Sequence, residues 1–369
     1  MTLRIAQLAN FVGPTSGGMR TAIEHVGRGY VAAGVDRIVV TPGAKDSIAE
    51  TEFGTVVRLR APQVGGGYRL IAQPWKVTEV LERFGPTTVE ISDKSTLLPV
   101  TRWARKNGIG SVLFSHERLD AMVSLRTGRQ LGVAAGVGAL YKLLGRAYDA
   151  IVVTSRYAAD EFAEVTTPLI RIPLGVDLDT FHPSRGRPVN DGLLKLVHAG
   201  RLSREKSPHL AVATAVELHR RGVPLRLDVY GTGPHLDELL AIAGDAPVRF
   251  HGYIGDRAVL AGHLARADIA LSVCPGETFG LAVLEALAAG TPVVTADTGG
   301  ARELVDATCG RWGPARPEAL ADAVLSLAAQ PAATRRTAAR RRAEQFDWQT
   351  CVDRMLALHA ELSAARAAA

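Results

Sequence analysis

The sequence predicts an α/β protein built from two doubly wound domains. The chain has 369 residues, which exceeds a single ordinary domain and fits two domains of about 150 to 200 residues. Short apolar runs alternate with segments of helical spacing along the chain, a pattern typical of parallel sheets with helices on both faces. Loops rich in Gly and charged residues follow several of these runs, and the ligands of such sheets bind at the ends of the strands.

The composition is that of an average soluble globular protein, with 47% hydrophobic and 22% charged residues. No apolar run approaches the roughly 18 residues that a membrane span requires. The start, Met1 to Ala6, leads straight into a strand without a secretory signal, so we expect a cytoplasmic protein. Cys274, Cys309 and Cys351 lack the spacing of a metal site or a disulfide framework and are expected to be small core residues.

The net charge is unevenly distributed. Residues 1–175 contain 21 Lys and Arg against 15 Asp and Glu, whereas the remainder contains 22 against 22, so the whole excess of +6 belongs to the first part. This asymmetry indicates an anionic partner for the N-terminal domain. The alternative is a solvated surface of ordinary arginines.

The N-terminal domain is expected to span residues 1–175. Its predicted strands are 3–9, 37–40, 56–59, 88–91, 111–114 and 151–154, and its predicted helices are 19–33, 77–84, 97–106 and 138–147. Gly17 and Gly18 precede the first helix, where glycines let a diphosphate approach the backbone closely; a plain flexible turn fits equally well. His116 follows a strand directly, so it is either a site residue or a hydrogen-bonded structural histidine.

The C-terminal domain is expected to span residues 190–347, after a polar linker at 184–192. Its predicted strands include 194–198, 269–273 and 293–295, and residues 225–233 are predicted to form a strand and a Gly-x-Gly turn. Its predicted helices include 208–221 and 317–329. Arg201 and Lys206 lie between a strand and a helix, where two cations can neutralise a diphosphate; a surface salt-bridge cluster with Glu205 is the alternative.

Two other charged stretches are assigned structural roles. Asp177-Leu178-Asp179 lies in the linker region and is interpreted as turn and capping chemistry. The basic run from Arg335 to Arg342 lacks interleaved aromatic residues, so we expect a solvated helix and no nucleic-acid site.

The central motif runs from Pro275 to Pro292. An apolar strand ends at Pro275-Gly276, and helical spacing begins at Phe279 and stops at Gly290. The first backbone N–H groups of such a helix attract a phosphate or a sugar oxygen. Glu277 lies in the loop, and Glu285 lies on a mainly apolar face, where burial requires hydrogen-bond donors such as ligand hydroxyls. An exposed helix carboxylate is the alternative for Glu285.

Glu277 and Glu285, with Phe279-Gly280-Leu281 between them and Gly290-Thr291-Pro292-Val293-Val294 after them, resemble the signature of the retaining glycosyltransferases of family 4. The string Gly200-Arg201-Leu202-Ser203-Arg204-Glu205-Lys206 matches a second motif of that family. The resemblance covers the whole chain. It is closest to actinobacterial mannosyltransferases acting on phosphatidylinositol mannosides, with Ser16–Arg20, Glu90–Asp93 and Ser115–Asp120 as shared landmarks.

The resemblance implies the GT-B fold, in which two Rossmann-like domains face a cleft and a C-terminal helix, about 348–369 here, packs back on the first domain. It also implies roles for individual residues. Arg201 and Lys206 would bind the pyrophosphate, Glu285 the ribose, and Glu277 with the amides of Phe279, Gly280 and Leu281 the sugar; Tyr253, Ile254 and Asp256 would form the base loop, and His116, Gly17 and Gly18 would approach from the N-terminal domain.

The implied reaction is the transfer of mannose from GDP-mannose to a glycolipid with retention. The leaving phosphate would take the acceptor proton, so neither a covalent nucleophile nor a metal or other cofactor is expected. Asp256 favours guanine because a carboxylate can accept from N1–H and the exocyclic amine together, although Asp256 is equally plausible as a helix N-cap. The implied partner is an anionic glycolipid at the inner face of the plasma membrane.

Three other functions remain open at this stage. The chain could use a UDP-sugar on a small-molecule acceptor. It could be a sugar-nucleotide 2-epimerase, which shares the fold and would interconvert the donor without an acceptor. A sugar-nucleotide-binding protein without catalytic activity would bind the donor but turn nothing over.

Overall fold

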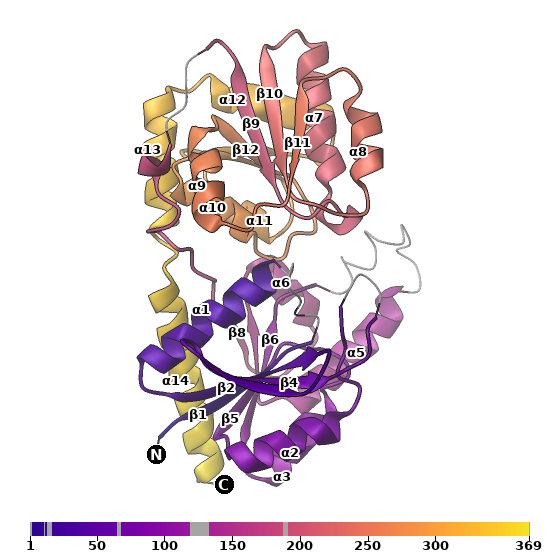
Figure 1. The fold of residues 1–369 in the computed structure, drawn as a ribbon, viewed down its shortest axis with the longest axis vertical. Coiled ribbons are helices and arrows are strands. Elements are labelled where there is room, and N and C mark those ends of the chain that lie inside the picture. Colours follow the sequence, from indigo (N-terminus) through magenta and orange to yellow (C-terminus); the bar gives the residue numbers. More distant parts are fainter. Residues whose placement is uncertain are drawn as a thin grey trace. The chain divides into compact units, whose positions relative to one another are not determined.

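The computed structural model describes residues 2–10, 12, 17–64, 68–118, 133–186 and 191–368, which form two compact units (Figure 1). Among these residues, unit 1 comprises those up to 118, those of 133–173 and those from 348 onward, and unit 2 comprises those of 174–347. The described residues of the polar run 184–192, which we expected to link the domains, therefore belong to unit 2. The chain passes between the units at Pro173 and Leu174, and again at Asp347 and Trp348.

Unit 1 contains an eight-stranded sheet in the order β3-β4-β2-β1-β5-β6-β7-β8. The strands are β1 (Arg4–Leu8), β2 (Asp36–Gly43), β3 (Ser47–Thr51), β4 (Gly54–Arg60), β5 (Thr88–Ile91), β6 (Gly110–Ser115), β7 (Ala150–Val153) and β8 (Leu169–Arg171). The prediction of a parallel sheet is confirmed for every pair except β3 and β4, which form an antiparallel hairpin at the edge. Gly54 has a φ of 96°, and a Cβ there would lie 2.6 Å from the Arg37 carbonyl oxygen, so this turn requires glycine.

The helices of unit 1 are α1 (Gly18–Ala32), α2 (Pro74–Phe84), α3 (Pro99–Lys106), α5 (Val133–Ala147), α6 (Arg156–Ala159) and α14 (Trp348–Ala367). α1 buries Ala22, Ile23, Val26 and Tyr30, which recur at the spacing of one helical face. α14 comes from the far end of the sequence and runs alongside the N-terminal elements (Figure 1).

A buried polar network fixes α14 to the sheet of unit 1. Glu90 on β5 accepts hydrogen bonds from Gln7 (2.7 Å), Tyr30 (2.8 Å) and His359 of α14 (3.2 Å). Arg37 donates to Gln7 through Nε at 2.8 Å, and all five side chains are buried. Burial alone would raise the pKa of Glu90, but the hydrogen bonds, led by that of His359, hold it below its ordinary value. The network satisfies a carboxylate that would otherwise be costly to bury.

Unit 2 contains a six-stranded parallel sheet in the order β11-β10-β9-β12-β13-β14. The strands are β9 (Leu194–Ala199), β10 (Leu225–Tyr230), β11 (Val248–Gly252), β12 (Ile269–Ser272), β13 (Val293–Ala296) and β14 (Gly310–Gly313). The helices are α7 (Pro208–Arg220), α8 (Leu236–Ala243), α9 (Arg257–Arg266), α10 (Leu281–Ala288), α11 (Gly300–Glu303), α12 (Pro317–Ala328) and α13 (Ala332–Ala343).

Helices cover both faces of the unit 2 sheet (Figure 1). α7, α8 and α12 pack on one face over a core that includes Leu196, Leu227 and Val229, while α9 and α10 lie on the other. The predicted doubly wound architecture is therefore present in both units. Within the described residues, no helix combines the length and the apolar character needed to span a bilayer.

The arginines of α13 are not merely solvated, contrary to the expectation for this basic run. Arg335 donates to the carbonyls of Leu327 and Ala328 at the end of α12, and Arg336 donates to Ala265 and Ala267 at the end of α9. Arg340 reaches the last carbonyl of α10, and Arg342 reaches the carbonyl of Glu303 at the end of α11. A cation at a helix C-terminus satisfies carbonyls that lack a partner and complements the helix dipole.

This capping predicts that substitutions of two neighbouring arginines change the stability of the protein by different amounts. Arg340 Nη1 donates to the carbonyls of Leu178, Phe181 and Ala288 at 2.9 to 3.1 Å, whereas Arg341 on the same helix is exposed. Arg340→Ala should lower the free energy of unfolding by roughly 2 kcal/mol, because partly buried carbonyls lose a charged donor. Arg341→Ala should change it by less than about 0.5 kcal/mol. Urea denaturation of both variants measures the difference, and equal stabilities would contradict the capping role.

Candidate active site

The loops that carry the predicted motifs of the C-terminal domain follow strands of the unit 2 sheet. Residues 200–206 follow β9, residues 231–233 follow β10, residues 273–280 follow β12, and residues 297–299 follow β13. Because these strands are parallel, their carboxyl ends meet at one edge of the sheet. The fold therefore brings together the segments in which ligands of doubly wound sheets bind.

Glycines allow the first two of these loops to touch through their backbones. A Cβ at Gly231, whose φ is 141°, would lie 1.9 Å from the carbonyl oxygen of Gly200, and one at Gly233 would lie 2.2 Å from that of Leu202. The Leu202 N–H donates to the Thr232 carbonyl at 3.0 Å. A larger residue at either glycine would collide with the loop that carries Arg201 and Lys206 and displace it.

Lys206 and Glu277 form an ion pair between two of the loops. Lys206 Nζ lies 3.1 and 2.9 Å from the two carboxylate oxygens of Glu277. Arg201 lies 3.7 Å from Glu205, so part of the salt-bridge cluster that was the alternative for this loop is present. The cation expected to bind a phosphate thus contacts the acid expected to bind a sugar.

The helix that follows Glu277 begins two residues later than expected. We predicted that it starts at Phe279, but α10 starts at Leu281 because Gly280 adopts a left-handed conformation, with a φ of 105°. The Gly280 carbonyl accepts from the N–H groups of Val283 and Leu284 at the first turn. A hydrogen bond from the first residue of α11 also holds this loop, since the Gly300 N–H donates to the Glu277 carbonyl at 2.6 Å.

Glu285 is buried in α10, so the interpretation as an exposed helix carboxylate is wrong. Its Oε1 accepts a hydrogen bond from Arg257 Nη2 at 2.7 Å. Burial raises the pKa of Glu285, and the positive charge and hydrogen bond of Arg257 oppose that rise. A partner from within the protein therefore satisfies part of the hydrogen-bonding requirement that we had assigned to a ligand.

The predicted base loop follows β11. Tyr253 is 59% exposed, and Ile254 is half-buried. Asp256 caps α9, because its Oδ1 accepts from the N–H groups of Ala258 at 2.8 Å and Val259 at 3.3 Å. The N-cap interpretation of Asp256 is therefore confirmed, while a contact with the base stays a prediction.

Sequence reasoning missed Arg257, although a signal for it existed. A cation directly after a capping Asp at a helix start is unfavourable for the helix dipole, so it calls for another explanation. Arg257 also lies over the Phe181 ring, with 4.9 Å between the guanidinium carbon and the ring centroid. The reach of its side chain to Glu285 joins α9 to α10.

In unit 1, His116 follows β6, as predicted, and its Nε2 is buried with no hydrogen-bond partner among the described residues. Its ring lies 4.2 Å from that of Phe114. Burial lowers the pKa of His116 to about 4, so the ring is neutral near pH 7. Nε2 thus lacks the hydrogen bond that would tie a buried structural histidine to its surroundings, which favours the site interpretation.

A buried ion pair beneath His116 was not predicted. Lys94 Nζ lies 2.8 and 2.9 Å from the carboxylate oxygens of Glu161 and also donates to the carbonyl of Glu117, the residue after His116. Both side chains are almost fully buried. A charged residue only a few positions after a buried parallel strand was the available signal, since Lys94 follows β5 closely.

The remaining predicted positions in unit 1 give less information. Gly17 precedes α1, and a Cβ there would meet no atom of the described residues within 4 Å, so no close contact requires glycine at this position. Gly18 is exposed at the start of α1. Ser16, Leu119 and Asp120 lie outside the described residues.

Two structural expectations for the other predicted groups are confirmed. The Asp177 carboxylate accepts from the N–H groups of Asp179 and Thr180, which is turn chemistry. All three cysteines are buried thiols outside any disulfide, and Cys274 donates through Sγ to the Glu205 carbonyl at 3.1 Å. No group of three His, Cys, Asp or Glu side chains suited to a metal ion occurs in the part of the chain that the structure describes.

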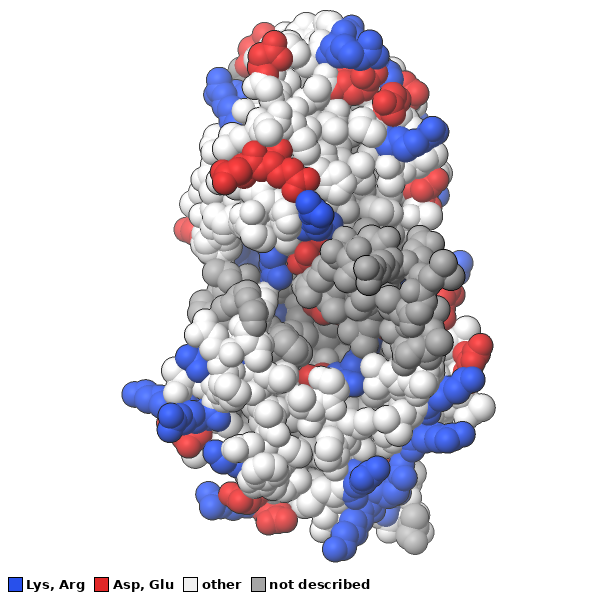
Figure 2. Space-filling model, turned by 90° about the vertical axis from the view of Figure 1, so that its right-hand side faces the viewer, with Lys and Arg blue, Asp and Glu red and all other residues white. Residues whose placement is uncertain are grey.

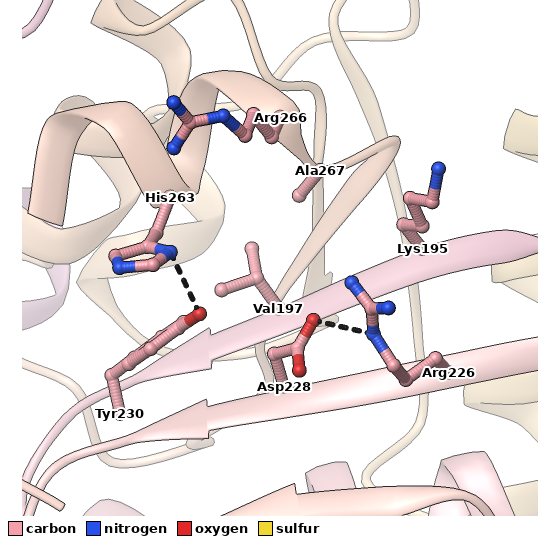
Figure 3. A pocket seen from close by; sticks show the side chains of 8 residues that line it. All are labelled: Lys195, Val197, Arg226, Asp228, Tyr230, His263, Arg266 and Ala267. Carbon is pink, nitrogen blue, oxygen red and sulfur yellow. Dashed lines mark hydrogen bonds and ion pairs between the residues drawn. The ribbon is translucent and has the colours of Figure 1, made fainter. Parts of the chain in front are cut away.

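A small polar pocket of about 60 Å³ lies between β9, β10 and α9 (Figure 3). Two of its cations are already paired, Lys195 with Asp191 at 3.0 Å and Arg226 with Asp228 at 2.9 Å. Lys195 and Arg226 are the second residues of their strands, so the pocket extends toward the amino ends of the sheet. We therefore do not assign it to the nucleotide.

Comparisons with known proteins agree with the motifs. Residues 16–180 match the family described as "Glycosyltransferase Family 4", and residues 194–330 match "Glycosyl transferases group 1". The chain is 40% identical over 96% of its length to the GDP-mannose-dependent alpha-(1-6)-phosphatidylinositol dimannoside mannosyltransferase of Mycobacterium tuberculosis, of which it covers 95%. It is 31% identical to the corresponding monomannoside mannosyltransferase of Mycolicibacterium smegmatis, over 44% of this chain and 48% of that protein.

Solved structures share the fold at low identity. Sucrose-phosphate synthase from Thermosynechococcus elongatus has a TM-score of 0.79 at 20% identity, covering 98% of this chain and 100% of that one. HepE of Anabaena in complex with UDP and glucose has a TM-score of 0.75 at 17% identity, covering 97% and 99%. With the family matches and the near full-length relative, they establish that the chain belongs to glycosyltransferase family 4 and has the GT-B fold.

Proposed function

We propose that this glycosyltransferase transfers mannose from GDP-mannose to a phosphatidylinositol mannoside, with retention at the anomeric carbon. The observation that carries the proposal is the 40% identity, over 96% of the chain, to a mycobacterial enzyme named for that donor and that class of acceptor. The loops at the carboxyl edge of the unit 2 sheet contain the charged groups that a nucleotide diphosphate sugar requires.

Each group is assigned to a part of the donor. Arg201 and Lys206 bind the diphosphate, and Glu285 accepts from the ribose hydroxyls. Glu277 and the backbone amides of residues 279–281 bind the sugar. Tyr253, Ile254 and Asp256 contact the base. His116, Gly17 and Gly18 of unit 1 remain candidates for contact with the donor, an assignment that rests on the family resemblance.

Donor binding exchanges the partner of Lys206. Because both carboxylate oxygens of Glu277 contact Lys206, a diphosphate of higher charge competes with Glu277 for the ammonium group. The carboxylate released in this way can accept hydrogen bonds from sugar hydroxyls. In the free protein, the ion pair thus already holds next to each other the ammonium group for the diphosphate and the carboxylate for the sugar.

The chemical step needs charge stabilisation more than a protein nucleophile. As the bond from the anomeric carbon to the diphosphate oxygen breaks, negative charge grows on the leaving group, and Arg201 and Lys206 stabilise it. The acceptor hydroxyl attacks the anomeric carbon from the same face and passes its proton to the leaving phosphate. Two cations fill the role of a metal ion, so we propose that the enzyme requires none.

The acceptor is proposed to meet the protein at an anionic membrane surface. α3 and α5 of unit 1 adjoin, since Arg105 donates to the Arg146 carbonyl at 2.9 Å. Their outer surface, which we name the α3–α5 surface, carries exposed Arg102, Arg105, Lys106, Lys142 and Arg146, with Leu143 47% exposed. Figure 2 shows Lys and Arg side chains gathered over unit 1, whereas blue and red side chains alternate over unit 2.

Four further basic residues of unit 1 differ in their exposure. Arg58 and Arg60 are exposed on β4, while Arg69 and Lys76 are half-buried. Arg126 and Arg129 lie outside the described residues. The α3–α5 surface, with its five exposed basic residues, is therefore the region to which we assign the membrane contact.

The full-length protein tests the proposed reaction directly. GDP-mannose, GDP-glucose and UDP-sugars are each incubated with a phosphatidylinositol mannoside acceptor, and glycosylated lipid is measured by mass spectrometry. Mannosyl transfer from GDP-mannose is expected. Transfer from a UDP-sugar to a water-soluble acceptor would replace the proposal, and interconversion of the donor without acceptor would indicate an epimerase.

Removing a diphosphate cation should slow turnover. Lys206→Ala and Arg201→Ala are each expected to lower kcat/KM by more than about tenfold, since each removes a charge-assisted contact to the leaving group. Arg204→Ala is the matched control, because Arg204 lies in the same loop but its side chain is 58% exposed and contacts Glu238. Near-normal activity of both site variants would remove the assignment.

Asp256 should affect the choice of base and the stability of α9 separately. Asp256→Ala removes the cap and should cost about 1 kcal/mol of stability. Asp256→Ser keeps a capping oxygen but loses the second carboxylate oxygen, to which no described residue donates. If Asp256 reads guanine, both variants lose most of the preference for GDP over UDP in calorimetric binding. A preserved preference in Asp256→Ser would leave only the capping role.

Membrane attachment should depend on salt and on the α3–α5 surface. Each basic residue near an anionic leaflet contributes about 1 kcal/mol, so three or four residues give reversible binding. The protein should sediment with anionic vesicles at low salt and less at high salt. Arg102→Glu with Lys106→Glu should abolish sedimentation, whereas Arg249→Glu with Arg341→Glu, exposed in unit 2, should not. Equal binding to neutral and anionic vesicles would exclude electrostatic attachment.

A further inference from the structure

The two oxygens of the buried Glu285 carboxylate have different surroundings. Arg257 Nη2 donates to Oε1 at 2.7 Å. No described residue donates to Oε2, and this oxygen is not among the fully buried polar atoms that lack a partner. One oxygen is therefore engaged by the protein, and the other keeps access to a donor from outside.

Arg257 is held in place by three separate contacts. It is the first residue of α9, a helix start fixed by the Asp256 cap. Its guanidinium lies over the ring of Phe181, which is fully buried. Its Nε is buried without a hydrogen-bond partner among the described residues. The guanidinium is instead held through Nη2, which forms the ion pair with Glu285.

A cation is needed at this position if Glu285 is to act as an acceptor. Burial disfavours the charged form of a carboxylate, and a protonated carboxyl group uses one oxygen as a donor. Arg257 is the charged group that counteracts burial at Glu285, through both its charge and its hydrogen bond. Without it, the carboxyl group would take up a proton at a higher pH.

We infer that Arg257 is a positioning residue for the nucleotide sugar: it keeps Glu285 ionised and engages Oε1, which leaves Oε2 to accept a hydroxyl of the nucleotide. Arg257 itself does not touch the nucleotide. The inference rests on the proposed role of Glu285 and adds a second residue, from a different helix, that determines whether Glu285 can perform it. The motif containing Glu277 and Glu285 is thus completed by α9.

A purely structural role makes a different prediction. The contact with Phe181 anchors the segment that enters unit 2, and Arg340 holds the carbonyl of the same residue. If Arg257 served only this anchoring, its loss would lower stability and weaken nucleotide binding by the same factor at every pH. The ionisation role instead predicts a defect that depends on pH.

The sign of this dependence follows from the pKa of Glu285. Burial already raises that pKa in the wild type, and removal of Arg257 raises it further. As the pH falls, Glu285 is therefore protonated earlier, that is at a higher pH, in the variant than in the wild type. The variant should therefore bind the nucleotide poorly under acidic conditions and recover as the pH rises.

Calorimetric titration of the full-length protein with GDP between pH 5.5 and 8.5 tests the inference. Arg257→Gln should bind GDP about tenfold more weakly than the wild type at the acidic end of this range, and the difference in affinity should narrow toward pH 8.5, because loss of Arg257 raises the pKa of Glu285. Arg257→Lys, which retains the charge, should show a smaller gap. Dividing the dissociation constant of each variant by that of the wild type at the same pH removes the contribution of the titration of GDP itself.

Two further variants make the result specific. Glu285→Gln should bind GDP weakly, and its difference in affinity from the wild type should not narrow as the pH rises, because the amide does not titrate. Arg266→Gln, at the other end of α9 and in the pocket of Figure 3, should match the wild type at every pH.

Three outcomes would overturn the inference. A defect of Arg257→Gln that is constant with pH, or no defect near pH 6 while Glu285→Gln binds weakly, would exclude the positioning role and leave the proposed donor site intact. Failure of the wild-type protein to bind GDP at all would overturn the proposed donor and this inference together.

Discussion

The capping of four helices by the arginines of α13 is the constraint on which the geometry of unit 2 depends. Helices on a parallel sheet point their N-termini toward the carboxyl edge of the strands, and their C-termini leave carbonyls unsatisfied at the opposite edge. Arg336 and Arg340 satisfy these carbonyls for α9 and α10. The two helices that carry Arg257 and Glu285 are therefore fixed at the ends remote from the site, which limits how far their active ends can shift.

The acids of the central motif are both paired within unit 2, but in different ways. Glu277 contacts Lys206 through both oxygens at a partly exposed position, whereas Glu285 is buried and contacts Arg257 through one oxygen. A partly exposed ion pair is worth little, so a diphosphate can separate Lys206 from Glu277 at low cost. The Arg257 side chain is 42% exposed, as is that of Lys206, but Glu285 is the more buried of the two acids. Loss of its cation is therefore more costly, and Glu285 keeps Arg257 while it accepts from the ligand.

Unit 1 relies on buried charge in a comparable way. The Glu90 network connects β1, β2, β5, α1 and the C-terminal helix α14, and it explains why the last residues of the chain belong with the first. The pair of Lys94 and Glu161 lies beneath the loop of His116 and binds the carbonyl next to it. Because buried ionic groups tolerate few alternative arrangements, both networks favour a single backbone conformation at the strand ends.

The sequence by itself determined the doubly wound fold of both units and the positions of most strands and helices. It also placed Arg201, Lys206, Glu277 and Glu285 correctly relative to their strands, because the period of apolar residues and the Gly and Pro stops are local properties. The local signal was less reliable at the start of α10, where the left-handed conformation of Gly280 delayed the helix by two residues. It also did not reveal the antiparallel edge strand β3.

Only the tertiary structure decided which charges are partners. The bonds of Lys206 to Glu277, Arg257 to Glu285 and Lys94 to Glu161 join residues that lie 28 to 71 positions apart in the sequence. The arginines of α13 read as a solvated basic run because the carbonyls they cap belong to other helices. Pairing over such separations depends on how sheets and helices pack, and a linear pattern of residue types carries no information about that packing.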